Sequence, residues 1–384
     1  MPDRAYLDWN ATAPLRPEAR AAMIEAMDVV GNPSSVHTEG RAAKMIVEKA
    51  REQVAALVGC DTSEVVFTSG ATEAAAIVGA QHYPSKIVSM VEHDAAWSLA
   101  SERSALLPVE RNGCVDISLL AKLADQSESR SLIVVQAANS ETGVKQDLTE
   151  ICRVARQHNH DVFVDATQVF GKADRGVQFE FDWAQDRPTY SCLSAHKFGG
   201  PSGVGALIVR GGTDVLSPHQ GGGQESGRRA GTEAVASIAG FGAACAALPE
   251  IFSPIVPGEL DGIYDMMDHQ KELEDAVSVA APDAVFMGRL ASRLPNTSCF
   301  AIPGWKGETQ VMQLDLAGFA VSAGSACSSG KVGPSRVLKA MGFDDITASS
   351  AIRVSMGPTT TKDEVSRFID AWTGLYRKMK TRAA

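Results

Sequence analysis

Short apolar runs alternate with stretches of helical periodicity along the first two-thirds of the chain, and this alternation constrains the fold more than any other feature. The apolar runs cover residues 65–67, 86–90, 132–136, 162–164 and 205–209. Helical patterns lie between several of them, and two more, over residues 16–30 and 38–58, precede the first run. Short apolar runs separated by helices are typical of parallel strands that are buried on both faces. The sequence therefore predicts an α/β fold with a mainly parallel sheet.

The last third of the chain follows a different pattern. Two prolines and a glycine interrupt the alternation within residues 253–258, and a long amphipathic helix pattern begins near Glu259. Separated strands are then expected over residues 297–302, 319–322 and 351–355, followed by a closing helix from Lys362. This arrangement predicts a second, α+β domain with its boundary near residue 250.

Net charge and cysteine content argue against several classes of function. The formal net charge of −10 disfavours a nucleic acid as the main partner. No apolar run approaches the ~20 residues of a membrane span, and the charged residues 1–4 do not resemble a signal peptide. The seven cysteines are scattered without a C-x-x-C pair, which indicates neither a zinc site nor a disulfide framework. We therefore expect a cytoplasmic protein without a metal centre, in which most cysteines are inert core residues.

Residues 67–73, Phe-Thr-Ser-Gly-Ala-Thr-Glu, join a strand to a helix of small residues. The N-terminus of a helix offers free backbone N–H groups and the positive end of the helix dipole, both of which suit a phosphate. The hydroxyl of Thr72 would add a further donor. The alternative is an ordinary capped turn between a strand and a helix.

Asp165 and Lys197 are two charged residues whose sequence surroundings indicate a role in catalysis or cofactor binding. Asp165 ends an apolar run, at the sheet edge where ligands gather in open α/β folds. Its carboxylate there could hold a proton on a pyridine nitrogen, or it could simply cap a helix. Lys197 precedes Phe-Gly-Gly-Pro and so lies on a tight turn, the fixed position that a Schiff-base lysine requires. A solvated surface lysine is the alternative.

Three further segments carry weaker signals. The glycine-dense, cationic stretch 221–232 could approach a phosphate through its backbone. Arg353 lies in an alternating strand pattern, where it could grip a carboxylate with two hydrogen bonds or could be a surface residue of an edge strand. Cys327 is surrounded by small polar residues in Gly-Ser-Ala-Cys-Ser-Ser-Gly, which favours an accessible nucleophilic thiol over a core cysteine. A turn that happens to contain cysteine is the alternative.

Taken together and in chain order, these segments resemble the NifS/IscS-like cysteine desulfurases of the class V aminotransferase group. The match runs nearly end to end, from Tyr-Leu-Asp-Trp-Asn-Ala-Thr at 6–12 and Gly-Asn-Pro-Ser-Ser-Val-His at 31–37 to Glu-His at 92–93. It continues with the phosphate turn, Asp-Ala-Thr-Gln at 165–168, Ser-Ala-His-Lys at 194–197 and Gly-Thr-Glu at 231–233. It ends with the Cys327 segment and Arg-Val-Ser-Met-Gly at 353–357. One such motif could arise by chance, but the whole series in family order could not.

The resemblance implies the fold-type I architecture of pyridoxal-phosphate enzymes, assembled as a homodimer. It implies a large cofactor-binding domain over residues 14–250 with a mainly parallel seven-stranded sheet. A smaller α+β domain would combine residues 1–13 with 251–384 and would carry the catalytic cysteine. The Cys327 segment matches the longer-loop branch of the family, which favours delivery of sulfur to a scaffold or other acceptor protein.

The resemblance also implies a role for each matching residue. Lys197 would carry the cofactor, Asp165 would pair with its ring nitrogen, Gln168 would bond its ring hydroxyl, and His93 would stack on the ring and act as acid or base near the sulfur. The phosphate would be held by Ala71, Thr72, Ser194, His196 and, from the partner subunit of the dimer, the residue equivalent to Thr232. Arg353 and Asn32 would bind the substrate.

The implied reaction converts L-cysteine to L-alanine and leaves the sulfur on Cys327 as a persulfide, for iron-sulfur cluster assembly or another acceptor. One departure from the family pattern concerns the cofactor site. Many relatives have Asn-Asn-Glu where this chain has Asn139-Ser140-Glu141, and their second asparagine touches the ring. Either Asn139 substitutes for that residue or the contact is lost. Another class V reaction, such as that of an aminotransferase or selenocysteine lyase, and a catalytically silent subunit are the alternatives.

Overall fold

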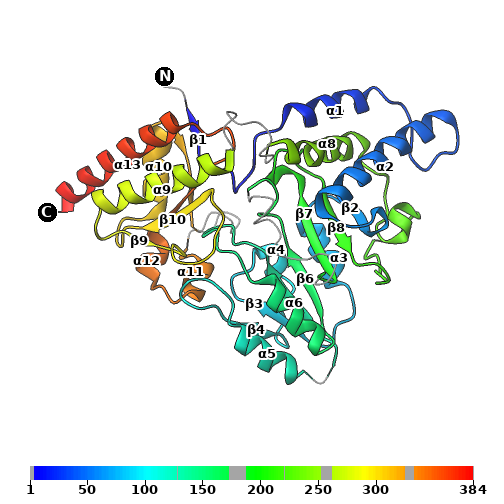
Figure 1. The fold of residues 1–384 in the computed structure, drawn as a ribbon, viewed down its shortest axis with the longest axis horizontal. Helices are drawn as coiled ribbons and strands as arrows, with labels where there is room; N and C mark the ends of the chain where they lie inside the picture. The colour runs from blue at the N-terminus through cyan, green and yellow to red at the C-terminus, as the bar shows by residue number, and fades with distance from the viewer. Residues whose placement is uncertain are drawn as a thin grey trace.

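The chain folds around two main sheets that lie side by side (Figure 1). The computed structural model describes residues 4–127, 129–172, 187–219, 221–251, 262–324 and 333–383. Cys327 lies outside these described residues. Within them, no helix is long and apolar enough to cross a membrane.

The larger sheet has seven strands in the order β2-β8-β7-β6-β5-β3-β4. They are β2 (Val65–Thr68), β3 (Lys86–Ser89), β4 (Ala105–Leu107), β5 (Leu132–Gln136), β6 (Asp161–Asp165), β7 (Tyr190–Ser194) and β8 (Gly205–Val209). All are parallel except β8, which runs antiparallel to both of its neighbours. The predicted α/β fold with a mainly parallel seven-stranded sheet is therefore confirmed.

One strand direction differs from the prediction. Residues 205–209 were expected to form a parallel strand, and this expectation is wrong. Only a short connection, which contains the 3₁₀ turn η2 (Ala195–Lys197), joins β7 to β8. A parallel crossover needs a dozen or more residues, so a connection this short returns the chain antiparallel.

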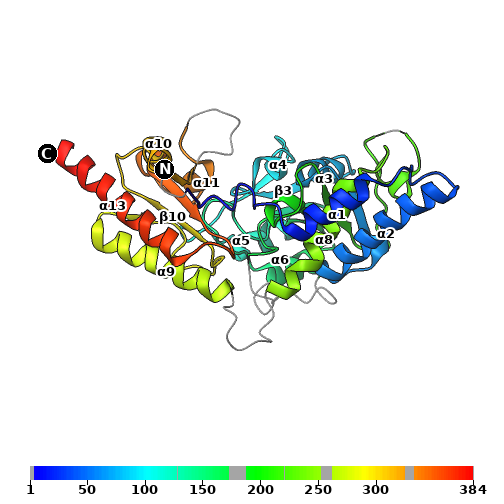
Figure 2. The same ribbon diagram turned by 90° about the horizontal axis from the view of Figure 1, so that it is seen from above.

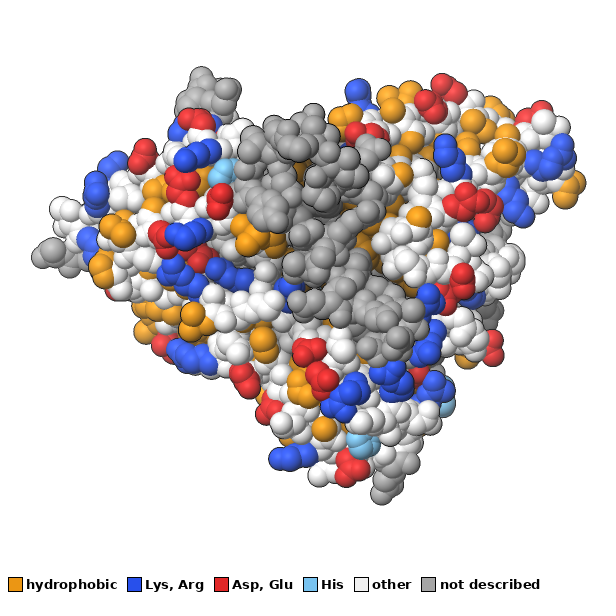
Figure 3. All heavy atoms as spheres, viewed as in Figure 1, with side chains coloured by type: hydrophobic (Ala, Val, Ile, Leu, Met, Phe, Trp, Pro, Cys, Tyr) orange, Lys and Arg blue, Asp and Glu red, His pale blue; other side chains and the backbone are white. Residues whose placement is uncertain are grey.

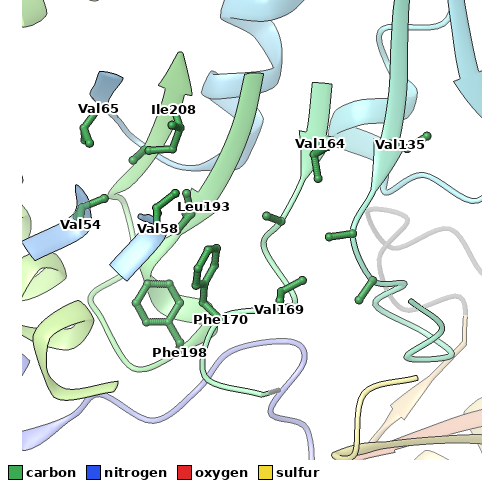
Figure 4. Packing of buried hydrophobic residues seen from close by; sticks show 14 of the residues in the cluster. Val54, Val58, Val65, Val135, Val164, Val169, Phe170, Leu193, Phe198 and Ile208 are labelled. Carbon is green, nitrogen blue, oxygen red and sulfur yellow. The ribbon is translucent and has the colours of Figure 1, made fainter. Parts of the chain in front are cut away.

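Helices cover both faces of the larger sheet. One face packs against α3 (Ala71–Gly79) and α4 (Asp94–Trp97), and the other against helices earlier and later in the chain. The latter are α1 (Pro17–Met27), α2 (Thr38–Val58), α5 (Ile117–Asp125), α6 (Leu148–Gln157) and α8 (Val235–Ile251). Figure 4 shows Val54 and Val58 of α2 beside Val65 and Ile208 of the sheet. Because neighbouring residues of a strand face opposite layers, β2, β3, β5, β6 and β8 are largely apolar, as the sequence suggested, whereas β7 is Tyr-Ser-Cys-Leu-Ser.

The prediction of a helix over residues 38–58 agrees with α2 at both ends. The His37 side chain accepts a hydrogen bond from Gly40 N at 3.3 Å and caps the start of the helix. Gly59 follows its end with φ +77°, a left-handed conformation that glycine adopts readily. The helix predicted over residues 16–30 is shorter in the structure and ends at Met27.

The smaller sheet belongs to the last third of the chain. Its order is β12-β13-β10-β9, and all its pairs are antiparallel. The strands are β9 (Val285–Phe286), β10 (Thr297–Ala301), β12 (Ser322–Ala323) and β13 (Ala351–Ser355), and the helices are α9 (Gly262–Ala280), α10 (Gly307–Leu316), α11 (Arg336–Ala340), α12 (Asp345–Ser350) and α13 (Lys362–Ala383). Figure 2 shows α9, α10 and α13 grouped at one end of the molecule, with α1, α2 and α8 at the other.

The N-terminal segment joins the C-terminal part of the structure. Strand β1 (Ala5–Tyr6) pairs in parallel with β11 (Phe319–Ala320), and Leu7 packs in the core around the smaller sheet. The single strand predicted over residues 319–322 is therefore split, with β11 pairing to β1 and β12 to β13. In Figures 1 and 2 the chain then runs from β1 across to α1.

Candidate active site

A pocket of about 380 Å³ lies at the carboxyl edge of the larger sheet, beyond the ends of β2, β5, β6 and β7. Nine of the residues singled out in the sequence line it: Ala71, Thr72, His93, Ser140, Asp165, Gln168, Ser194, His196 and Lys197. Asn32, Asn139, Thr232 and Arg353 are not among its lining residues. The edge at which parallel strands end is where ligands bind in folds of this type.

Lys197 enters the pocket from η2, directly after β7. Its ammonium donates hydrogen bonds to the carbonyl oxygens of Asn10 at 2.9 Å and Ala11 at 3.0 Å. Asn10 is fully buried and belongs to the N-terminal segment that crosses between the two sheets. The lysine is thus held by backbone far away in sequence, which gives it the fixed position expected of a covalent attachment point.

The N-terminus of α3 forms another part of the pocket wall. Gly70 precedes the helix, and a Cβ built on it would come to 3.6 Å from Ser194 Oγ. The first backbone N–H groups of a helix have no partner within it, so those of α3 are available to an anion. Thr72, Ser194 and His196 add polar side chains to this wall. The turn before α3 thus has the hydrogen-bond donors that a phosphate site requires.

His196 is placed to act as a neutral donor. Burial, together with the charges of Lys197 and Lys172, lowers the pKa of its imidazole to about 4. The ring is therefore uncharged near neutral pH, and its Nδ1 lies 3.2 Å from Thr12 Oγ1. A neutral imidazole can still donate one hydrogen bond to a bound anion.

Asp165 and His93 face the pocket from two different strand ends. Asp165 is buried, and its Oδ1 accepts a hydrogen bond from Thr167 N at 3.0 Å. His93 caps α4, with its Nδ1 accepting from Ala95 N at 3.2 Å. In the neutral ring this leaves the proton on Nε2. The pocket thus combines a carboxylate, an imidazole and an amine.

Glu92 is a second carboxyl near Asp165, and its sequence pattern did not indicate a role of its own. It is fully buried, and its Oε1 accepts a hydrogen bond from Gln136 N at 2.8 Å. Burial and the nearby charge of Asp165 raise the pKa of Glu92 to about 8. Glu92 is therefore largely protonated, and so uncharged, near neutral pH.

This raised pKa predicts that stability falls with pH. Between the ordinary pKa of 4.5 and about 8, the folded chain binds more protons at Glu92 than the unfolded chain does. The variant Glu92→Gln, which keeps the acceptor for Gln136 N, should therefore raise the free energy of unfolding by about 3 kcal/mol more at pH 8 than at pH 5. Thermal unfolding of the variant across this pH range measures the effect. The exposed Glu102→Gln should show no such trend, and a Glu92→Gln gain that is independent of pH would contradict the assignment.

Asn139 stabilises the loop after β5 instead of facing the pocket. Its Oδ1 accepts hydrogen bonds from Glu141 N and Thr142 N, each at 2.9 Å, and its Nδ2 donates to Val91 O at 3.1 Å. Its amide is therefore engaged within the loop and is not placed to replace the missing asparagine. Ser140 lines the pocket in its place.

Arg353 is buried on β13 and does not itself line the pocket. Its Nη2 pairs with Asp8 Oδ1 at 2.6 Å, and its Nη1 donates to Ser140 O at 2.9 Å. Its Nε is buried and has no hydrogen-bond partner among the described residues. The arginine thus links the N-terminal segment, the smaller sheet and the pocket wall, and its Nε–H has no partner among the described residues.

Asn32 and Thr232 lie away from the pocket of their own chain. Both are exposed, and Thr232 borders a small separate cavity at the end of the glycine-rich stretch. That stretch is anchored by Glu225, which forms a bidentate ion pair with Arg51. Arg51 Nη2 donates to Glu225 Oε1 at 2.8 Å, and Nη1 donates to Oε2 at 2.9 Å. The Glu225 backbone has φ +50°, so the ion pair holds a conformation that non-glycine residues rarely adopt.

The described cysteines differ from a reactive thiol. Cys152, Cys192, Cys245 and Cys299 are buried. Burial raises the pKa of the Cys192, Cys245 and Cys299 thiols, and it raises that of Cys60 to about 12. These thiols are therefore not thiolates near neutral pH. Within the described residues, no group of three or more His, Cys, Asp or Glu side chains is arranged to hold a metal ion.

The donors and acceptors of the pocket fit pyridoxal phosphate. A helix N-terminus and hydroxyls suit its phosphate, a buried carboxylate suits its ring nitrogen, and Lys197 offers an amine for its aldehyde. Gln136 also lines the pocket and is almost fully buried, yet its Nε2 has no hydrogen-bond partner among the described residues. An unsatisfied buried donor costs free energy, which a bound acceptor would recover.

Comparisons with known proteins agree with these observations. The family model described as Aminotransferase class-V matches residues 5–368. The chain is 35% identical to cysteine desulfurase IscS of Dictyoglomus turgidum, over 99% of this chain and 96% of that protein. Among solved structures it is similar to a NifS-like protein from Rickettsia africae (TM-score 0.88, 30% identity, covering 97% of this chain and 99% of that one). It is also similar to SspA in complex with cysteine (TM-score 0.73, 26% identity, covering 93% and 100%).

These matches span nearly the whole chain, and they agree with the residue pattern and with the arrangement of the pocket. The chain therefore belongs to the class V aminotransferase family, among relatives named as cysteine desulfurases.

Proposed function

We propose that the chain is a pyridoxal-phosphate-dependent cysteine desulfurase, which converts L-cysteine to L-alanine and transfers the sulfur to Cys327. One observation carries the proposal: Lys197, Asp165 and His93 come together in a single pocket from strand ends that are far apart in sequence. The relatives named as cysteine desulfurases and the similar structure solved with cysteine support the choice of substrate.

The cofactor would be held by residues on three sides of the pocket. The N-terminus of α3, with Thr72, Ser194 and His196, would bind the phosphate, Asp165 the ring nitrogen, and Lys197 the aldehyde carbon. Once bound, the protonated ring withdraws electrons from the substrate carbon next to the amine. The Nε2–H of His93 and the amide of Gln168 would contact the ring from the remaining sides.

Arg353 would bind the substrate carboxylate. Its buried Nε lacks a partner among the described residues, while Asp8 and Ser140 O hold the other two nitrogens in place. A carboxylate that accepts from Nε would satisfy a buried donor of a guanidinium that Asp8 and Ser140 O already orient. The pairing with Asp8 thus serves to position the arginine.

Lys197 and Cys327 would then move the proton and the sulfur. The Lys197 amine takes the proton from the substrate Cα. The Cys327 thiolate attacks the substrate sulfur, so that an S–S bond forms as the Cβ–S bond breaks. The electron pair of the broken bond stays with carbon and ends in a new C–H bond of alanine. Gly324, three residues before Cys327 in the sequence, lines a cavity that also contains His93 and Ser140, which supports the proposal that His93 exchanges protons near the sulfur.

We further propose that the enzyme is a cytoplasmic homodimer with domains at residues 14–250 and at 1–13 with 251–384. The hydrophobic clusters around the two sheets, each made almost entirely of residues from one of these domains, support this division. Exposed apolar side chains on and around α1 and α2, Ile24, Met27, Val30, Val36 and Met45, support a dimer interface there. Figure 3 shows hydrophobic side chains gathered at this end of the molecule. The acceptor of the sulfur would be a scaffold or carrier protein.

The proposal is tested by measuring both products. Purified protein loaded with pyridoxal phosphate is incubated with L-cysteine and a thiol reductant, and alanine and sulfide are quantified over time. Equal amounts of the two products are expected, because each turnover releases one of each. Alanine without sulfide, or activity on other amino acids but not on cysteine, would assign the chain to another class V reaction.

A further inference from the structure

Lys172 is a buried lysine that the proposed reaction does not use. It is 3% exposed and lies four residues after Gln168, on the turn that follows β6. Burial, reinforced by the charges of Lys197 and Arg353, lowers the pKa of Lys172 well below its ordinary value. Burying an amine costs free energy, and a methionine of similar length would avoid that cost. The cost of burying this amine therefore suggests that the lysine has a function other than stabilising the fold.

The contact that Lys172 makes is to a residue of the pocket. Its Nζ donates a hydrogen bond to Gln168 Oε1. The other end of the same amide, Gln168 Nε2, donates to Asn10 O at 3.1 Å. Asn10 O also accepts the hydrogen bond from Lys197 Nζ at 2.9 Å. A continuous set of hydrogen bonds thus connects Lys172, through Gln168 and one carbonyl oxygen, to the amine of the pocket.

These contacts decide which way round the Gln168 amide lies. Asn10 O can only accept, so it takes the amide nitrogen, and Lys172, which has N–H groups whether it is charged or neutral, donates to the amide oxygen on the other side. The amide nitrogen then faces Asn10 O and the pocket, which Gln168 lines. One of its two N–H groups bonds Asn10 O, and the second is available to a bound acceptor. Without the lysine, the amide oxygen would lose this partner.

We propose that Lys172 is a positioning residue, which orients the Gln168 amide so that its free N–H is presented to an oxygen acceptor on the bound cofactor. This inference rests on the proposed function, because it takes the pocket as the site of pyridoxal phosphate. Lys172 acts through Gln168 and does not itself line the pocket.

The test is a double-mutant cycle on the affinity for pyridoxal phosphate. Cofactor-free full-length protein is titrated with pyridoxal phosphate for the wild type, Lys172→Met, Gln168→Ala and the double variant. Lys172→Met is expected to raise the Kd roughly tenfold, the effect of one well-oriented hydrogen bond. In the Gln168→Ala background the same change should add nothing, because the amide through which Lys172 acts is gone.

Thermal unfolding of the cofactor-free protein separates positioning from a structural role. Lys172→Met should leave the Tm equal or higher, since it replaces a buried amine by an apolar chain, while the cofactor affinity falls. Lys86→Met is the matched control, because Lys86 Nζ is also partly buried and donates to a backbone carbonyl, Leu99 O, away from the pocket. It should not change the Kd.

A second variant keeps the test open if Lys172→Met does not fold. Gln168→Glu can still accept from Lys172 but offers no N–H, so it should weaken cofactor binding at least as much as Gln168→Ala does. A normal Kd for either Lys172→Met or Gln168→Glu would overturn the inference. An equal loss from Lys172→Met with and without Gln168 would also overturn it. Failure of the wild type to bind pyridoxal phosphate would instead refute the proposed function.

Discussion

Replacing Lys197 by alanine is expected to lower the rate of alanine formation from L-cysteine roughly a thousandfold or more. Lys197 is the one amine among the described residues that line the pocket. Its hydrogen bonds to the carbonyls of Asn10 and Ala11 fix it where it can both hold the cofactor and take the Cα proton. No other described side chain in the pocket combines these two abilities, so both functions should be lost together. Alanine production under saturating cofactor and cysteine measures the loss.

A chemical label gives an independent readout of the same assignment. Borohydride reduction of the loaded wild type, followed by mass spectrometry of its peptides, should find the cofactor on Lys197. Lys172→Met is the matched control, because Lys172 is a buried lysine nearby that does not line the pocket. This variant should still be labelled on Lys197. A label on Lys172, or a Lys197→Ala protein that keeps turnover within about tenfold of the wild type, would contradict the assignment.

The fold was largely predictable because its signals are local. Five of the seven strands of the larger sheet appear in the sequence as short apolar runs, whereas β4 and β7 do not, and α2 has both a capping residue and a terminal glycine. The incorrect predictions concern the direction and the partners of individual strands. The run at residues 205–209 looks the same whether its strand is parallel or antiparallel, and only the short connection to β7 decides the direction. The split of residues 319–322 between two sheets likewise depends on the N-terminal strand that pairs with one half.

The candidate site was predictable where a residue follows a strand or opens a helix. Asp165, Lys197 and Thr72 are of this kind, and all three line the pocket. Contacts between distant segments left no signal in the sequence. The pairing of Arg353 with Asp8 joins the two ends of the chain, and Glu92 acquires its raised pKa only when folding buries it and brings it near Asp165. Lys172 could have been noticed as a lysine four residues after Gln168, but its burial could not.

The change that best separates desulfuration from every other class V reaction is Cys327→Ala. It should lower the production of sulfide and alanine from L-cysteine roughly a thousandfold or more, while the affinity for pyridoxal phosphate stays unchanged. The reason lies in the electron balance. The substrate sulfur leaves carbon only when a thiolate forms a new S–S bond with it, and without that nucleophile the Cβ–S bond has no acceptor for its sulfur. Parallel quantification of both products, with a cofactor titration, measures the effect.

Two further variants determine whether the loss is specific to this thiol. Cys327→Ser should be as inactive as Cys327→Ala, because a hydroxyl does not ionise near neutral pH and cannot form a persulfide. Cys114→Ala should remain active, because burial raises the pKa of that partly buried thiol and disfavours its thiolate. If the Cys327→Ala variant formed alanine at the same rate as the wild type, the sulfur would be leaving without a protein nucleophile. The pocket would then still be a class V site, but the substrate or the acceptor of its reaction would be another.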